Sequence, residues 1–239
     1  MSESRILKYQ HKTLAALDGK IGDFYLAGGT ALSLFYFRHR VSHDLDFFTQ
    51  GYSGERVKEI VDYLKDELKV AIKLTGSVSE KGKAGMSVYN IAFTQKDILK
   101  IDFVEDVFKL IKPTKSVEGV SILSLEDIYM RKIYAIAGAA RVSDEVGRSK
   151  FAGGRQDAKD FYDLYFLSNT FMPISKFADK YCDAVMVEAL IRWYRTYDRM
   201  AIIDGILSLD TEKKADYKSM EKHFKAEMDR LLDRQLGDI

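Results

Sequence analysis

The chain has 239 residues, of which 46% are hydrophobic and 12% aromatic, so it can bury a sizeable core and is neither disordered nor a coiled coil. Its 37 Lys and Arg side chains nearly balance its 36 Asp and Glu side chains, and the net charge of +1 excludes a histone-like protein that coats polyanions. The single cysteine, Cys182, indicates a reducing compartment, and no apolar run reaches the ~20 residues that span a bilayer, so we expect a soluble, cytoplasmic, globular protein without a membrane partner.

The first half of the chain predicts a mixture of helices and strands. A weak helical period covers residues 5–18, and the apolar run Phe24–Ala27 predicts a buried strand that stops at Gly28-Gly29. Residues 30–38 are apolar nearly all round, as in a helix buried against a sheet. Further along, the patterns predict a strand at 44–48, a helix at 54–68 and a three-stranded meander at 70–74, 87–94 and 97–104.

After Pro113 the strand pattern fades. Ser124 and Asp127 form a start similar to a capping box for a helix from Leu125 to about residue 140. The Gly-rich, basic stretch 141–156 is predicted to be a loop, followed by helices near 157–168, 175–195, 198–208 and 215–236. The expected fold class is therefore α/β (α+β): a mixed sheet with flanking helices over residues 1–123, then an all-helical domain over residues 124–239.

The side chains best suited to chemistry lie around the first turn and the second strand. Ser42, Asp44 and Asp46 are two residues apart, so on a strand they share one face, about 6.6 Å from one to the next. Two carboxylates at this spacing can bind hard cations such as Mg²⁺. Upstream, the Gly28-Gly29 turn lets backbone N–H groups approach a phosphate. Each motif alone is commonly a plain turn or a pair of solvated acids, but in this order they indicate transfer from a nucleoside triphosphate.

Later residues could complete such a site. Asp102 lies on the polar face of its strand, as a third carboxylate or an ordinary solvent-facing acid. Lys132 falls on an otherwise apolar helix stripe, so its ammonium must extend to solvent or meet an anion such as a triphosphate. Asp157, Asp160 and Asp163 follow at three-residue steps, and Asp157 has the simpler explanation that acids in a first turn favour the helix dipole.

These residues together resemble a known family. The run Ala27-Gly28-Gly29-Thr30-Ala31-Leu32, followed by Arg40-x-Ser42-x-Asp44-Leu45-Asp46-Phe47, is similar to the nucleotidyltransferase toxins of AbiEii/AbiGii type, within the polymerase-β-like superfamily. The later lysine of the family matches Lys132, and its Arg-Asp-x-x-Asp-Leu helix matches Lys159-Asp160-x-x-Asp163-Leu164, with lysine in place of arginine. Residues 141–156 are long for the family, which leaves Asp157 as an alternative to Asp160.

The resemblance implies an enzyme that moves a nucleotide from an NTP to an acceptor, with Mg²⁺ as cofactor. Such enzymes act as the toxin of a toxin–antitoxin or abortive-infection system, and some modify the 3′ end of tRNA, so the implied partners are an NTP, RNA and a cognate antitoxin protein. The implied metal ligands are Asp44, Asp46 and Asp102, and Asp102 also takes the proton of the acceptor hydroxyl. Lys132 and Asp160 are implied as further catalytic residues, and the implied NTP-binding residues are Gly28, Gly29, Thr30, Arg40, Ser42 and Lys132.

Two alternative functions stay open at this point: transfer to a small molecule such as an antibiotic, and a non-catalytic NTP-binding module that acts through a partner protein. Charge offers two further expectations. Three clustered carboxylates repel one another, so at least one should have a raised pKa without metal. Residues 131–155 carry an excess of basic side chains, which predicts a loop that grips the phosphates of an RNA acceptor (Arg131, Lys132, Arg141, Arg148, Lys150 and Arg155).

Overall fold

The computed structural model describes residues 3–80, 82–211 and 216–237 and divides the chain into two compact units. The first unit comprises Met1–Tyr36 and Val41–Ser124, and the second comprises Phe37–Arg40 and Leu125–Ile239. The short segment Phe37–Arg40 therefore belongs to the second unit, although the sequence places it inside the first predicted domain.

The first unit is built on a mixed sheet, in agreement with the predicted fold class. Within the described residues its order is β3-β4-β5-β2-β1-β7-β6, with β2 parallel to β5 and β1 parallel to β7. The predicted meander is present as β3, β4 and β5, which pair antiparallel. The strands are β1 (Tyr25–Leu26), β2 (Asp44–Thr49), β3 (Ala71–Val78), β4 (Met86–Ala92), β5 (Ile98–Glu105), β6 (Lys115–Val117) and β7 (Val120–Ile122).

The hairpin of β6 and β7 is absent from the sequence prediction, which expects strand character to fade after Pro113. Its strands are only three residues long, too short to show an alternating pattern. The turn residues Glu118 and Gly119 both have positive φ, at 49° and 74°. This backbone is typical of a two-residue hairpin turn, and the Glu-Gly pair is the one local signal for it.

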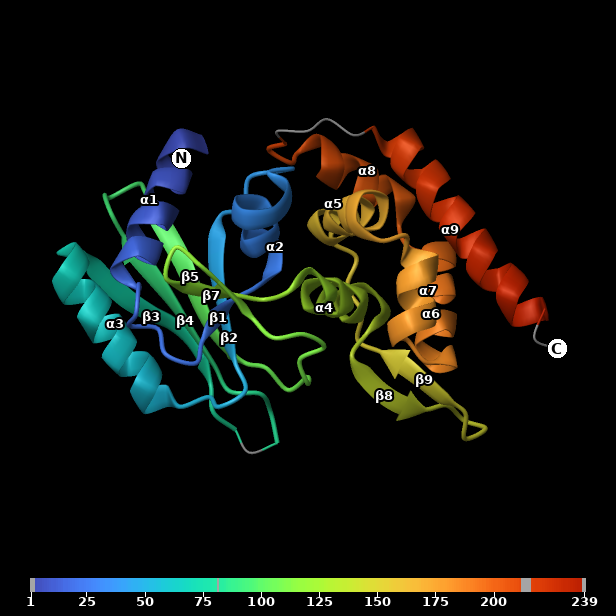
Figure 1. The fold of residues 1–239 in the computed structure, drawn as a ribbon, viewed down its shortest axis with the longest axis horizontal. Coiled ribbons are helices and arrows are strands. Elements are labelled where there is room, and N and C mark those ends of the chain that lie inside the picture. The colour runs from blue at the N-terminus through green and yellow to red at the C-terminus, as the bar shows by residue number, and fades with distance from the viewer. Residues whose placement is uncertain (1–2, 81, 212–215, 238–239) are drawn as a thin grey trace. The chain divides into compact units, whose positions relative to one another are not determined.

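Two helices of the first unit, α1 (Glu3–Ala16) and α3 (Gly54–Leu68), contact each other and pack against the sheet (Figure 1). The third, α2 (Gly28–Ala31), continues as a π-helix over Leu32–Phe37. Helix α3 begins as predicted, because the Ser53 side chain caps it by accepting a hydrogen bond from the Arg56 backbone N–H.

The central strands bury one face and leave the other partly open. Over residues 44–47 of β2 and 99–103 of β5, buried apolar side chains alternate with partly exposed polar ones. The buried side chains are those of Leu45, Phe47, Leu99, Ile101 and Phe103. Because successive side chains on a strand point to opposite faces, the polar residues between them share the other face of the sheet. This alternation sets the position of the acids described below.

The second unit is largely helical. Its core contains the ring of Phe161, whose centroid lies 4.7 Å from that of Phe224 and 6.0 Å from that of Trp193. Helix α5 continues as a π-helix over Leu167–Phe171. The helices are α4 (Leu125–Ala137), α5 (Ala158–Phe166), α6 (Ile174–Tyr181), α7 (Ala184–Thr196), α8 (Arg199–Leu207) and α9 (Tyr217–Gly237).

One prediction for the second unit is wrong in part. The single helix expected at 175–195 is interrupted, because Cys182 is extended and the Asp183 carboxylate caps α7 by accepting from the Met186 N–H. Residue 215, where the last helix was expected to begin, lies outside the described residues, and α9 begins at Tyr217.

The expected loop at 141–156 contains a hairpin of β8 (Ala140–Ser143) and β9 (Ser149–Ala152), so the second unit is not all-helical. Asp144 holds its turn by accepting from the backbone N–H groups of Val146 and Arg148, and Gly147 supplies a φ of 80°. Strands of only four residues, half of them polar, carry too weak a pattern to be recognised in the sequence.

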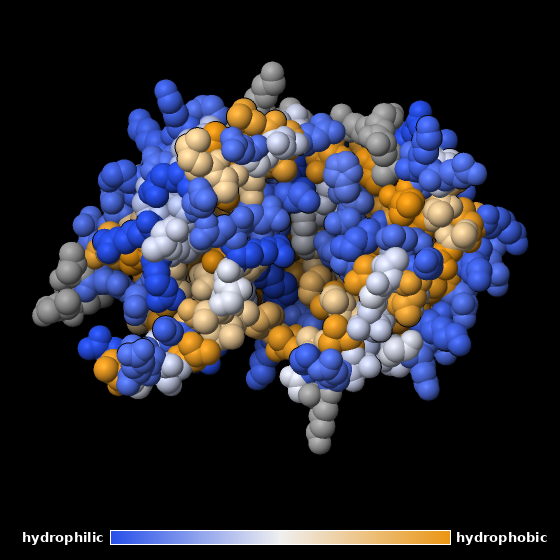
Figure 2. Space-filling view, turned by 180° about the vertical axis from the view of Figure 1, so that it is seen from behind, coloured by the Kyte–Doolittle hydropathy of each residue, from blue (hydrophilic) through white to orange (hydrophobic). Residues whose placement is uncertain are grey.

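No helix in the described part of the chain is long and apolar enough to cross a membrane. Figure 2 shows a face on which hydrophilic side chains prevail and apolar ones form smaller patches. Among the exposed large apolar side chains are Val107, Val146, Met200 and Leu207.

Candidate active site

Parallel pairing of β2 with β5 brings the three predicted metal ligands together. In the register, Asp46 is the partner of Asp102 and Asp44 is the partner of Lys100. Partners in register point to the same face, so these four side chains form a two-by-two arrangement on the open face of the sheet. We call it the β2–β5 quartet (Asp44, Asp46, Lys100 and Asp102).

Lys100 supplies the cation of this quartet. Its ammonium donates to Asp102 Oδ2 at 2.7 Å and lies 3.7 Å from Asp44 Oδ2. Burial alone would lower the pKa of Lys100, but the hydrogen bond to Asp102 and the charges of Asp102 and Asp44 raise it. The Lys100 side chain therefore stays protonated and positively charged among three carboxylates.

Asp102 has the most unusual environment of the three acids. Its Oδ1 atom is buried and has no hydrogen-bond partner among the described residues. Burial raises the pKa of the Asp102 carboxyl and the charge of Asp44 raises it further, although Lys100 opposes both. A raised pKa in the cluster was predicted from repulsion, but its larger cause is loss of solvent.

The glycine turn lies directly against the quartet. Gly28 has a φ of +67°, and a Cβ atom there would be 2.7 Å from Asp46 Oδ2. The neighbouring Ala27 N–H donates to the Asp46 carbonyl at 2.9 Å. The positive φ favours glycine, and any larger residue would displace the Asp46 carboxylate, which explains the residue type at the first position of α2.

Thr30 and Ser42, two of the predicted NTP-binding residues, hold the turn to the start of β2. The Thr30 hydroxyl lies 2.8 Å from the Ser42 hydroxyl and also bonds the Asp44 carbonyl. The Gln10 amide donates to the Ser42 carbonyl at 2.8 Å. These contacts fix the spacing between the Gly28-Gly29 turn and the acids.

In the second unit, Asp163 lies at the centre of a buried group of charges. Its Oδ1 accepts from His39 Nε2 and Arg40 Nε, both at 2.7 Å. Its Oδ2 accepts from Arg40 Nη2 at 2.8 Å and from the Lys132 ammonium at 2.6 Å. Burial alone would raise the pKa of Asp163, but the charges of Lys132 and Arg40 hold it well below its usual range.

Asp160 shares Lys132 with Asp163. The Lys132 ammonium donates to Asp160 Oδ1 at 2.6 Å, and Arg155 Nε donates to Asp160 Oδ2 at 2.5 Å. The anion that Lys132 meets is thus a pair of carboxylates, and its side chain is only 9% exposed. We call this group the buried charge cluster (His39, Arg40, Lys132, Arg155, Asp160 and Asp163).

The cluster bears on the open question of the helix carboxylate. Asp157 is the N-cap of α5 and accepts from the Lys159 N–H at 2.9 Å, whereas Asp160 and Asp163 are buried and paired. Arg40, expected at the NTP, binds Asp163 with two nitrogens and has a side chain only 4% exposed.

Sequence reasoning missed two participants in these two groups, Lys100 and His39. Lys100 was visible only as the neighbour of Asp102 on the polar strand face, and His39 carried no local signal, since it reaches Asp163 through the tertiary fold. Asp163 was already a candidate, and Arg155, expected at the phosphates of an RNA, donates to Asp160 instead.

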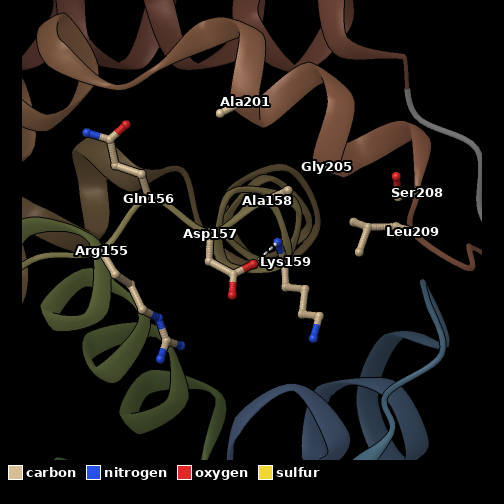
Figure 3. A pocket seen from close by; sticks show the side chains of 9 residues that line it. All are labelled: Arg155, Gln156, Asp157, Ala158, Lys159, Ala201, Gly205, Ser208 and Leu209. Carbon is tan, nitrogen blue, oxygen red and sulfur yellow. Dashed lines mark hydrogen bonds between the residues drawn. The ribbon is translucent and has the colours of Figure 1, made fainter.

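A cavity of about 530 Å³ opens beside the N-terminal end of α5. Figure 3 shows the side chains of Arg155, in the segment before α5, and of Lys159, in the first turn of α5, both extending away from α8, and the hydrogen bond between Asp157 and the Lys159 backbone. The wall on the α8 side is small and uncharged (Ala201, Gly205, Ser208 and Leu209). The cavity thus combines cationic side chains with an uncharged wall.

The β2–β5 quartet fits a divalent ion in its chemistry. In the positions that the described side chains take, no three His, Cys, Asp or Glu residues converge closely enough to hold a metal. The quartet nevertheless offers hard oxygen donors on one face, and two of its acids already hold the Lys100 cation. The chemistry of these donors suits a divalent ion such as Mg²⁺, and the ligand roles of Asp44, Asp46 and Asp102 stay a prediction.

Comparisons with known proteins find relatives in sequence and in fold. An uncharacterised protein of Aquifex aeolicus is 27% identical over 212 residues, which cover 86% of this chain and 83% of that protein. The crystal structure of JHP933 from Helicobacter pylori has a TM-score of 0.60 at 18% identity and covers 98% of this chain and 96% of its own. MenT4, a nucleotidyltransferase toxin from Mycobacterium tuberculosis, has a TM-score of 0.55 at 12% identity and covers 97% and 84%.

These structural likenesses, at low identity, concern the fold. The sequence profile of the family described as nucleotidyl transferase AbiEii toxin, type IV toxin–antitoxin system, matches residues 13–238, which is almost the whole chain. The protein therefore belongs to the AbiEii family of nucleotidyltransferase toxins.

Proposed function

We propose that this nucleotidyltransferase uses Mg²⁺ to transfer a nucleotide from an NTP to RNA, at the 3′ end of a tRNA. The observation that carries the proposal is the β2–β5 quartet, in which three carboxylates share one sheet face beside a glycine turn. The place of the family in toxin–antitoxin systems gives the enzyme an antitoxin as its biological counterpart.

Nucleotidyltransferases generally use divalent metal ions, which here would be held by Asp44, Asp46 and Asp102 and would neutralise charge on the phosphates. Asp102 is the carboxylate that we assign to take the proton of the acceptor hydroxyl, since burial raises its pKa. The acceptor oxygen then bonds the α-phosphorus, the bond from the α-phosphorus to the bridging oxygen breaks, and pyrophosphate leaves.

The remaining predicted residues divide into two roles. Gly28, Gly29 and Thr30 offer backbone N–H groups to the phosphates at the start of the helical segment that runs to Phe37. We assign Lys132 to supply positive charge for the triphosphate. Asp160 orients the Lys132 side chain, which donates to it at 2.6 Å. We assign Arg40 an indirect part, in which it holds Asp163 beside Lys132.

An RNA acceptor is supported by the basic side chains of the second unit. Arg155 and Lys159 line the cavity beside α5, and Arg148 and Lys150 are exposed on the β8–β9 hairpin. A polyanion gains more from separated cations than a small neutral acceptor does, because each phosphate contact releases counterions.

The direct test is to incubate the purified protein with each of the four α-³²P-labelled NTPs, total RNA and either Mg²⁺ or EDTA. We expect label in RNA of tRNA size for at least one NTP with Mg²⁺, and none with EDTA. Label confined to the small-molecule fraction would contradict the RNA acceptor, and transfer in EDTA would contradict the metal.

We also expect the hairpin to contribute to RNA affinity. Of the six basic side chains in 131–155, Arg148 and Lys150 are the two for which the described residues offer no ion-pair partner. Replacing both with Ala should weaken RNA binding and lower the slope of log affinity against log salt by about two. Filter binding over a salt series measures this slope.

The matched control is Lys58→Ala with Lys65→Ala, which removes two exposed charges from α3. Arg155 is left intact because it belongs to the buried charge cluster. Equal slopes for the hairpin variant and wild type would exclude the hairpin from the RNA-binding surface.

A further inference from the structure

The cation in the β2–β5 quartet comes from the protein itself. Lys100 is the register partner of Asp44 and is bonded to Asp102, so its ammonium lies within reach of acids on both strands. Three carboxylates and one ammonium give the quartet a formal charge of −2. The Lys100 side chain is 39% exposed, so its ammonium can move toward solvent without unfolding the strand.

We propose that Lys100 is a resident counter-ion that competes with the divalent ion for Asp44 and Asp102. The inference rests on the proposed function, because it assumes that these acids bind metal. Metal binding then requires the ammonium to withdraw, so the free protein binds divalent ions more weakly than its three acids alone would.

The contacts of Asp102 support competition rather than simple support of the fold. Lys100 bonds Oδ2, while Oδ1 is buried with no hydrogen-bond partner in the described part of the chain. A buried carboxylate oxygen without a donor is costly, and a metal ion at this face could satisfy it where one ammonium does not. The acid is thus only half satisfied by its present partner.

The predicted sign is unusual for a residue in a binding site, because removing Lys100 should strengthen metal binding. A divalent ion and an ammonium about 4 Å apart repel even in water. Lys100→Met keeps the length of the side chain and removes its charge, and we expect the dissociation constant for Mg²⁺ to fall roughly tenfold. Lys100→Arg keeps the charge and should bind Mg²⁺ much as wild type does.

Lys73→Met is the matched control. Lys73 is exposed and is the register partner of Asn90, which is the register partner of Lys100. The Lys73→Met substitution therefore removes the same charge from the same face of the sheet, two strands away from Lys100 at about 10 Å. At that distance salt screens most of the effect, so the affinity for Mg²⁺ should stay near that of wild type.

The experiment is calorimetric titration of Mg²⁺ into the four full-length proteins without nucleotide. Tighter binding by Lys100→Met alone supports the inference, including the case in which wild type shows no measurable binding. Equal or weaker binding by Lys100→Met overturns it while leaving the metal site of the proposed function intact. Absence of binding by every protein, with or without NTP, overturns both.

A second measurement follows the wild-type protein and uses a variant only to assign the Lys100 signal. In protein labelled with [ε-¹³C]lysine, the Lys100 signal is identified by its absence from Lys100→Arg. Adding Mg²⁺ should shift this signal and leave that of Lys73 in place. A Lys100 signal that stays unchanged through saturation would show that the ammonium does not make way for the metal.

Discussion

Asp46→Asn should lower the rate of nucleotidyl transfer by about a thousandfold, because metal ligation of this kind supplies several kcal/mol of transition-state stabilisation. The substitution keeps the shape of the side chain and removes one of three carboxylates on a single sheet face. Initial rates of label transfer at saturating NTP measure the loss.

The stability of Asp46→Asn should not fall with its activity. Removing one negative charge relieves repulsion in the quartet, so the melting temperature without metal should equal or exceed that of wild type. The rise in melting temperature that Mg²⁺ gives the wild type by mass action should disappear.

Asp66→Asn, an exposed change on α3, is the control and should alter neither quantity. An Asp46→Asn enzyme that keeps more than a tenth of the activity would remove the quartet from the catalytic site. A fall in melting temperature would instead assign Asp46 a structural role.

The positions of the acids on the sheet could be predicted from the sequence because they follow from local periodicity, whereas metal binding by these acids stays a prediction. Asp44 and Asp46 are two residues apart, so they share one face of a strand, and the Gly28-Gly29 pair predicts a turn. Pairing of Asp46 with Asp102 needed one further fact, the parallel register of β2 and β5, which no local pattern specifies.

The buried charge cluster shows where this reasoning ends. The position of Lys132 on an apolar stripe left two outcomes open, extension to solvent or contact with an anion, and the structure pairs its ammonium with the carboxylates of Asp160 and Asp163. The carboxylate partners of Lys132 come from α5. Arg40 and His39, which also contact Asp163, come from a segment about 120 residues before Asp163 in the chain. Such contacts are made by tertiary folding, so their residues cannot be paired from the sequence of any one element.

The same cluster yields the largest expected effect on stability. Asp163→Asn should lower the free energy of unfolding of the second unit by about 3–5 kcal/mol, because it leaves buried cations without their carboxylate. Asp163 is fully buried and accepts from His39, Arg40 and Lys132. Asparagine keeps the shape but offers one acceptor oxygen in place of two.

The chain provides its own probe for this measurement. Trp193 is its single tryptophan, and it is buried in the second unit against Phe161 and Phe224. Urea unfolding followed by tryptophan fluorescence therefore reports on the unit that holds the cluster. Asp229→Asn, which breaks the exposed pair with Lys225 on α9, is the control and should leave the midpoint unchanged.

The difference in unfolding free energy between wild type and Asp163→Asn should depend on pH in a defined direction. The pKa of Asp163 is lower in the folded protein than the value of about 3.9 for an unfolded Asp, so its stabilisation is complete above that pH. As the pH falls below about 4, the unfolded chain takes up the proton first and this stabilisation is progressively lost. Asp163→Asn has no carboxyl to protonate at this position, so the gap in unfolding free energy should be constant from pH 5 to 7 and narrow below about 4. A gap that is small at pH 7, or that does not change on acidification, would mean that Asp163 is not the anion that stabilises these cations.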